Sequence, residues 1–257
     1  MSNWYQVNKV FALKVLHNTF AGLLDLLYPR ICLGCNKSFS EEEGVHICRM
    51  CLESIEEKGV RRCYKCGLEL GLGVRSSDKG CPECIKMNLR FERGFFVSGY
   101  TGPLKELIIH YKYHKHEFLA KPLADLLVNQ LLNEGIISEI DVIVPVPLHW
   151  RKKLRRGFNQ SELFAKRISR KLLVPISVDN LSYCKNTLSQ TQLSRTERAE
   201  NVFGAFKVRK PELFSRKQIL LIDDVLTTGT TASECARTLE KAGAEKVFFI
   251  ALARAKL

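Results

Sequence analysis

The segment 219–231 constrains the fold more than any other part of this sequence, because a short apolar run leads directly into two carboxylates and a Thr/Gly loop. Residues 219–222 are apolar at every position and too few for a helix, which predicts a strand covered on both faces of a parallel sheet. Asp223 and Asp224 then fall at the carboxyl end of this strand, where open α/β sheets bind their ligands. The segment therefore predicts an α/β fold with a ligand site at that edge.

The loop after the two carboxylates has the composition of an anion site. It offers hydroxyls, closely spaced backbone N–H groups and one glycine that can adopt a positive φ. Its residues are Thr227, Thr228, Gly229, Thr230 and Thr231. A helix is predicted over 232–242, and a helix N-terminus binds phosphate without a lysine. Beside Asp223 and Asp224, this loop suits a ribose 5-phosphate whose 2- and 3-hydroxyls donate to the carboxylates. The alternative is an ordinary strand-turn-helix junction with two solvated aspartates, while a P-loop is disfavoured because no Gly-Lys-Ser/Thr follows.

The charge of the chain indicates anionic partners. Its 257 residues contain 40 Lys and Arg against 27 Asp and Glu, a net charge of +13. Phosphorylated metabolites, nucleic acid and an anionic membrane surface all remain compatible with this charge. The pattern of a secretory signal is missing near the amino terminus, so we expect a cytoplasmic protein. Residues 1–28 predict an amphipathic helix that packs on the rest of the protein, with peripheral contact to the inner face of the membrane through 1–27 as the alternative.

Eight of the ten cysteines form four C-x-x-C pairs. Two such pairs complete a tetrahedral zinc site, and the spacings between pairs are typical of zinc ribbons. The simplest assignment gives two structural Zn²⁺ sites in sequence, one from Cys32, Cys35, Cys48 and Cys51 and one from Cys63, Cys66, Cys81 and Cys84. Cross-braced pairing stays open at this point, and disulfides or a redox pair would also account for paired cysteines. The ribbon module is predicted to span 29–90.

The remainder, 91–257, is predicted to form a second domain. Patterning indicates strands over 91–100 and 202–208 and helices over 103–114 and 118–132. The segment 141–147 predicts a strand that leaves the sheet at its alternating prolines. Three histidines between 110 and 116 are expected to face solvent or phosphate and not a metal.

A basic segment follows the proline-rich strand and ends where a further helix begins. Basic side chains there would neutralise a pyrophosphate, and a solvated face or a nucleic-acid contact is the alternative. The candidate residues are Leu148, Arg151, Arg155, Arg156, Asn159 and Gln160. Trp150 and Phe158 flank the basic run and offer aromatic surfaces to a single strand. The polar block 185–201 suits a hood over a charged substrate, with an ordinary surface loop as the alternative.

The order of these motifs resembles the ComF/GntX family of double-zinc-ribbon phosphoribosyltransferase-like proteins. The blocks that carry the resemblance are the cysteine pairs, L-I-I-H-Y-K-Y, V-P-V-P-L-H-W, R-R-G-F-N-Q, T-x-x-Q-x-x-L-S-R-x-x-R-x-x-N and I-D-D-V-L-T-T-G-T-T. The resemblance implies a type I phosphoribosyltransferase fold, phosphoribosyl pyrophosphate (PRPP) with Mg²⁺ as ligand, and a role in DNA uptake during natural transformation. It names no acceptor substrate.

The resemblance also implies roles for individual residues. The 5-phosphate would lie on 227–231 and the ribose hydroxyls on Asp223 and Asp224, with Lys112 nearby and Leu148 and Arg151 at the leaving pyrophosphate. Arg195 and Arg198 would be cations of a catalytic lid. The predicted architecture is a twisted parallel sheet with flanking helices, preceded by the zinc-ribbon module and the helix of 1–28. Two functions are compatible with it: a phosphoribosyltransferase, or a module that senses PRPP or binds single-stranded DNA without turnover, in contact with DNA-uptake proteins.

Overall fold

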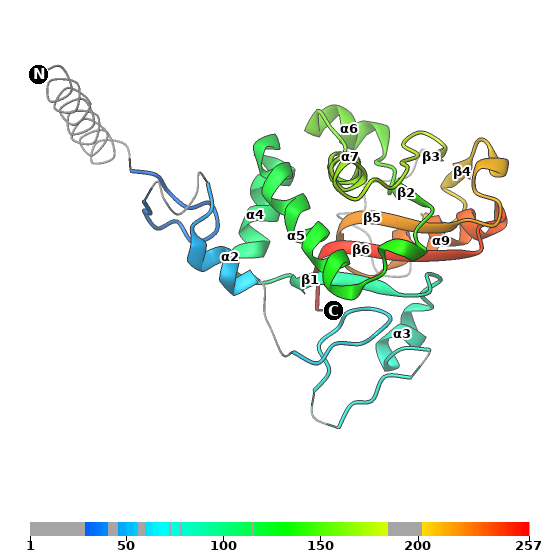
Figure 1. Ribbon diagram of the computed structural model, residues 1–257, viewed down its shortest axis with the longest axis horizontal. Coiled ribbons are helices and arrows are strands. Elements are labelled where there is room, and N and C mark those ends of the chain that lie inside the picture. Colours follow the sequence, from blue (N-terminus) through cyan, green and yellow to red (C-terminus); the bar gives the residue numbers. More distant parts are fainter. Residues whose placement is uncertain are drawn as a thin grey trace, which may run out of the picture.

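The computed structural model describes residues 29–40, 46–55, 60–71, 73–77, 79–114, 116–184 and 202–256. The predicted N-terminal helix and the block with Arg195 and Arg198 lie outside these residues. The described chain centres on a parallel sheet of four strands in the order β1-β6-β5-β2 (Figure 1). A second sheet pairs β3 with β4 in antiparallel fashion. The strands are β1 Gly94–Gly99, β2 Val142–Pro145, β3 Leu181–Tyr183, β4 Phe206–Val208, β5 Gln218–Leu226 and β6 Lys246–Arg254.

Helices cover both faces of the parallel sheet. They are α2 Arg49–Ile55, α3 Pro82–Met87, α4 Gly102–Tyr113, α5 Ala120–Glu134, α6 Trp150–Arg156, α7 Gln160–Leu172 and α9 Thr230–Lys241, with 3-10 turns η2 Glu117–Leu119, η3 Ile137–Glu139 and η5 Pro211–Leu213. The buried faces of α4, α5 and α7 pack on one side, while α9 packs on the other. None of the helices within the described ranges has the length and apolar character needed to cross a bilayer.

Strand β5 is buried on both faces, as its continuous apolar run predicts. Leu220 and Ile222 join the core beneath α5 and α7, and Ile219 and Leu221 join the core beneath α9. The strand is longer than predicted, because hydrogen-bonded pairing with β6 continues to Leu226. Pairing with β2 stops at Ile222, where Pro145 ends the shorter strand. Asp223 and Asp224 therefore lie inside β5, just beyond the end of its neighbour.

The two cysteine-rich segments pack on opposite faces of the sheet. Cysteines of the first join the core of α4, α5 and α7, whereas cysteines of the second join the core of α9. The edge strand β1 connects these cores, because Phe95 belongs to the first and Phe96 to the second. In Figure 1, α2 of the first segment lies beside α4, and α3 of the second lies below the sheet.

Candidate functional site

The eight paired cysteines form two quartets, each suited to one zinc ion. Within each quartet all four sulfurs lie within 4.8 Å of one another. The Sγ–Sγ distances include 3.7 Å for Cys32–Cys51, 3.9 Å for Cys35–Cys48, 3.6 Å for Cys63–Cys84 and 3.7 Å for Cys66–Cys81. Four thiolates about 2.3 Å from a tetrahedral ion would be about 3.8 Å apart. All ten cysteines are free thiols. The sequential pairing is thus confirmed over cross-braced pairing and disulfides, and the closed ligand sets indicate structural zinc.

Each quartet is supported by an equivalent hydrogen bond from the backbone to a cysteine sulfur. The backbone N–H of Cys48 donates to Cys32 Sγ over 3.3 Å, and that of Cys81 donates to Cys63 Sγ over 3.2 Å. Such amide donors stabilise a thiolate and orient it toward the ion. The two sites are therefore matched in local geometry, although they lie on opposite faces of the sheet.

The two carboxylates of β5 have different surroundings. Asp224 Oδ1 forms an ion pair with Lys112 Nζ at a distance of 2.7 Å. Asp223 Oδ1 accepts hydrogen bonds from Ser161 Oγ at 3.0 Å and from the Asp224 backbone N–H at 2.9 Å. Burial and the neighbouring charge of Asp224 raise the pKa of Asp223 to about 7, against the opposing effect of Lys112. One carboxylate is thus paired with a cation, and the other is near its titration point at neutral pH.

Lys112 comes from the last turn of α4 and was among the predicted site residues. The apolar side of α4, including Leu107, Ile108 and Tyr111, is fully buried, which directs the neighbouring Lys112 toward β5. Burial lowers the pKa of Lys112, but the charge and hydrogen bond of Asp224 outweigh it, so the pKa is raised. Tyr111 Oη donates to the backbone carbonyl of Gln160 over 3.2 Å and ties α4 to the start of α7.

The basic segment after β2 forms a short helix of its own, α6. His149 caps it, because its Nδ1 accepts from the Arg151 backbone N–H at 3.2 Å. Arg151 is exposed and lies over the ring of Trp150, 5.2 Å from its centroid.

Two other cations of α6, Lys152 and Arg156, are half-buried and lie one helical turn apart. Burial and the charge of Arg156 lower the pKa of Lys152, while the charge of Asp223 opposes them. Lys152 of α6 is therefore within electrostatic reach of Asp223, while Arg156 lies over the ring of Tyr113.

The residues that join α6 to α7 serve mainly as scaffold. Asn159 caps α7 by accepting from the Ser161 backbone N–H at 3.2 Å, and its Nδ2 donates to the Val146 carbonyl over 3.1 Å. Gln160 is 1% exposed and accepts from Arg156 Nη1 at 2.9 Å. Leu148 is half-buried and Arg155 is exposed. Phe158 is buried against Tyr111, so among the two flanking aromatics only Trp150 presents a large exposed ring.

Residues 227–231, hereafter the phosphate loop, lead into α9 as predicted. Gly229 has a φ of +74° and caps the helix, and its carbonyl accepts from the Ser233 backbone N–H at 2.8 Å. A Cβ at Gly229 would lie 2.4 Å from Leu89 Cδ2, so any other residue would be strained by the positive φ and would displace the Leu89 side chain. The hydroxyls of Thr228 and Thr230 are 3.0 Å apart. The loop thus places helix N-terminal amides and hydroxyls at the same end of β5 as the two carboxylates.

Several functional contacts were not predicted from the sequence. Ser161, which donates to Asp223, was given no role, and Lys152, which interacts electrostatically with Asp223, was expected only as one of several basic side chains near a pyrophosphate. Two features of the sequence could have indicated these contacts: the serine at the second position of a capped helix, and the lysine four residues before an arginine.

The three histidines between 110 and 116 group with one another, and their ring centroids are 4.9 to 6.0 Å apart. Across the described ranges, only the cysteine quartets bring three or more metal-binding groups within 4.8 Å.

Comparison with known proteins identifies two domains. A double zinc ribbon domain matches residues 23–85, and a phosphoribosyl transferase domain matches residues 158–256. Competence protein F of Haemophilus influenzae is 31% identical over 81% of this chain and 90% of its own length. The DNA utilization protein YhgH of Salmonella typhi is 30% identical over 86% of this chain and 96% of its own. Among solved structures, a purine phosphoribosyltransferase from Pyrococcus horikoshii has a TM-score of 0.35 and 17% identity over 51% of this chain and 73% of that one.

Proposed function

Because this chain belongs to the ComF/GntX family of double-zinc-ribbon phosphoribosyltransferase-like proteins, we propose that it binds PRPP at the carboxyl end of β5. The observation that carries the proposal is the placement of two carboxylates and a glycine-capped helix N-terminus on consecutive segments of one strand end. The phosphate loop would bind the 5-phosphate through its amides and hydroxyls. Asp223 and Asp224 would accept from the ribose hydroxyls.

The residues around the carboxylates suit a ligand that carries both negative charge and a cation. Lys112, Lys152 and Arg156 supply positive charge for the pyrophosphate. Asp223 forms no ion pair within the described chain, and burial together with the charge of Asp224 raises its pKa. Carboxylate oxygens are ligands that Mg²⁺ prefers, so Asp223 and Asp224 would hold the ion, which supplies charge neutralisation to the pyrophosphate when bound.

A transfer reaction at this site would depend on positioned charge. Cleavage at the anomeric carbon develops positive charge on the sugar and negative charge on pyrophosphate. The carboxylates of Asp223 and Asp224 would stabilise the sugar, and the cations of α4 and α6 would stabilise the leaving group. No covalent nucleophile is required by this scheme. Arg195 and Arg198 are proposed as further cations contributed by the block 185–201.

The names of the relatives support a role in handling DNA. Competence protein F and DNA utilization protein YhgH each match this chain over most of its length. We therefore infer that the protein acts in DNA uptake or in the use of incoming DNA, and that PRPP is its small-molecule ligand there. The positive net charge of +13 is consistent with contact to an anionic polymer.

Titration calorimetry with PRPP and Mg²⁺ tests the proposed site. We expect binding by the native protein, loss of binding in Asp223→Ala plus Asp224→Ala, and unchanged binding in Asp179→Ala, an exposed aspartate that serves as control. Pyrophosphate release with a panel of bases, amines and DNA then tests turnover. Binding without release would show a sensor, and absence of binding by the native protein would overturn the proposal.

A second function is favoured by the surface of α6. This helix carries five basic residues, and its two apolar side chains are open to solvent, Trp150 by 53% and Leu154 by 75%. An exposed tryptophan among cations suits stacking with the bases of single-stranded DNA. If the protein is a DNA-binding module, affinity for an oligonucleotide should fall steeply with salt, survive the double aspartate variant and weaken about tenfold in Trp150→Ala. Equal affinity in Trp150→Ala would contradict this function.

A further inference from the structure

Arg254 is a buried cation at the end of β6 whose surroundings are formed by backbone. Its side chain is buried, with the residue only 2% exposed, and within the described ranges no carboxylate lies within ion-pair distance of it. Nη1 instead donates to the carbonyls of Leu226 at 3.1 Å and Thr227 at 2.7 Å, and also to that of Ala255. A buried guanidinium without an anion is unfavourable unless such bonds compensate it. Two of the three carbonyls that accept from Nη1 therefore belong to the residues that enter the phosphate loop.

These bonds fix the direction of the first loop amides. In a planar trans peptide the carbonyl and the following N–H point in opposite directions. When Arg254 holds the carbonyls of Leu226 and Thr227, the N–H groups of Thr227 and Thr228 are turned away from the guanidinium. Arg254 thus sets the orientation of donors that a bound phosphate would need.

The same guanidinium contacts the second zinc-ribbon segment. Arg254 Nη2 donates to Met87 Sδ over 3.4 Å. Met87 is the last residue of α3, the helix that contains the zinc ligand Cys84. Two residues further, Leu89 occupies the space against Gly229 where a Cβ would lie 2.4 Å from its Cδ2. The segment 87–89 therefore supports both the entry of the phosphate loop and its central glycine.

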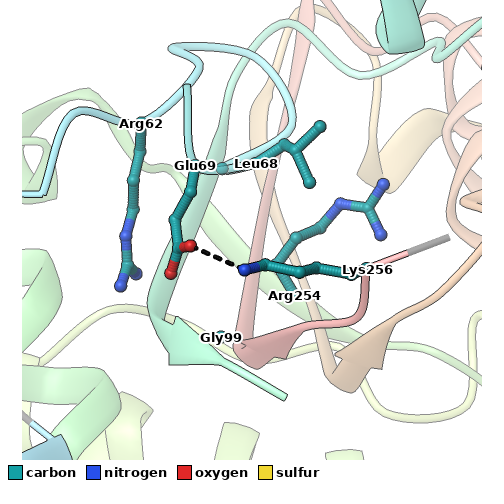
Figure 2. Close-up of a pocket in the computed structure, with 7 residues that line it drawn as sticks. Arg62, Leu68, Glu69, Gly99, Arg254 and Lys256 are labelled. Atoms are coloured by element: carbon teal, nitrogen blue, oxygen red, sulfur yellow. Dashed lines mark ion pairs between the residues drawn. The ribbon is translucent and has the colours of Figure 1, made fainter. Parts of the chain in front are cut away.

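A second set of contacts joins the same two parts of the molecule. Figure 2 shows Glu69 of the ribbon segment paired with Lys256 beyond β6, 3.0 Å apart, next to Arg254. Arg62 Nη1 also donates to the carbonyl of Val97 in β1 at 3.3 Å. The cavity between these side chains is about 10 Å³, about enough for one water molecule. The second ribbon is thus in direct contact with the strand ends behind the phosphate loop.

The first quartet has different neighbours. It belongs to the core on the opposite face of the sheet, and its Gly34 approaches Pro103 at the start of α4, with a Cβ position 3.1 Å from the proline Cβ. Among the described residues, no hydrogen bond or ion pair connects it to the phosphate loop. The two matched zinc sites therefore differ in what they support.

We propose that Arg254 is a positioning residue that couples the second quartet, Cys63, Cys66, Cys81 and Cys84, to the conformation of the phosphate loop. Zinc in this quartet, and not zinc in the first, then determines how tightly the loop binds the 5-phosphate. The proposal about affinity rests on the proposed function, whereas the proposal about loop conformation does not.

Cys81→Ser and Cys48→Ser form a matched pair, because each residue is the third ligand of its quartet and donates its N–H to the first. Each should release one of two bound zinc ions. Hydrogen exchange over 226–231 without ligand is expected to speed up about tenfold in Cys81→Ser and to stay within about twofold in Cys48→Ser. Equal exchange in both variants, or unchanged exchange in Cys81→Ser after zinc loss, would overturn the coupling.

Arg254→Met and Arg254→Lys test the coupling without touching a zinc ligand. We expect Arg254→Met to keep two zinc ions, to speed up loop exchange, and to weaken PRPP binding about tenfold. Arg254→Lys should restore part of both effects, since the ammonium can still donate to a carbonyl. Native loop exchange and native PRPP affinity in Arg254→Met would overturn the proposal. If the native protein binds no PRPP, the proposed function fails while loop exchange still decides the coupling.

Discussion

The two faces of the central sheet contribute different kinds of groups to the candidate site. The face covered by α4 and α7 supplies side chains, because Lys112 and Ser161 contact the carboxylates of β5. The face covered by α9 and the second quartet supplies backbone, held in place by Gly229 and Leu89. Changes on the first face should therefore alter charge and titration. Substitutions on the second face should alter the geometry of the phosphate loop, and their effects should not depend on pH.

The largest effect is expected for Gly229→Ala on the backbone face. Alanine is strained at a φ of +74° and its Cβ would overlap Leu89, so the free energy of unfolding should fall by about 3 kcal/mol. Gly135→Ala is the matched control, since Gly135 has a φ of +65° but open space around the added Cβ. It should lose only about 1 kcal/mol. Urea denaturation measures both values. Equal losses would show that the Leu89 contact contributes nothing.

On the side-chain face, Lys112→Met should have the next largest effect. It leaves the buried carboxylate of Asp224 without its cation, and we expect a loss of about 2 kcal/mol in the free energy of unfolding. It should also raise the pKa of Asp223 further, because Lys112 opposes the shift in the native protein. Lys105→Met on the exposed side of α4 should change stability by less than about 0.5 kcal/mol. A matching loss in both variants would remove the special role of Lys112.

The pH dependence of binding separates the two faces directly. The folded pKa of Asp223 is about 7, above the unfolded value of about 3.9, so this group lowers the free energy of unfolding as pH rises from about 4 to about 7. A ribose hydroxyl or Mg²⁺ favours the ionised carboxylate, so PRPP affinity should rise about tenfold from pH 6 to pH 8. In Asp223→Asn, the only pH dependence of PRPP affinity that remains should come from the titration of PRPP itself. The same rise in that variant would exclude Asp223 as its source.

Ser161→Ala should give the smallest effect. It removes one hydrogen bond to Asp223 and should cost about 1 kcal/mol in stability. Because that hydrogen bond favours the carboxylate, the midpoint of the pH profile should move upward. Ser169→Ala on the same helix also loses one hydrogen bond, to the Val174 carbonyl, and should leave the midpoint unchanged. Identical midpoints in the two serine variants would contradict a link between Ser161 and Asp223.

The local parts of the site could be predicted from the sequence. One continuous segment contains strand β5 with its two aspartates, the phosphate loop and α9. The residue types and their spacing in this segment were therefore enough to predict the site. The cysteine quartets were equally accessible, because two close pairs make each site. Strand β6 was not predicted, although residues 247–253 have the same continuous apolar signal as 219–222.

The parts that were missed depend on contacts between distant residues. Ser161 meets Asp223 only because α7 packs on the sheet beside β5, whereas Lys112 was predicted at the site but its pairing with Asp224 was not. Arg254 contacts Met87 from the far end of the described chain. No spacing rule predicts such contacts, since they follow from the order of strands in the sheet. The structure was needed to assign a role to these side chains.

The strand order also determines when the sheet can assemble. Strand β6 is the last strand along the described chain, yet it lies between β1 and β5 and pairs with both. During synthesis each zinc ribbon can close around its ion as soon as its four cysteines have emerged, because its ligands are near one another in sequence. The edge strand β1 has no hydrogen-bonded partner in the sheet until β6 arrives, so the two ribbons acquire their fixed places only at the end.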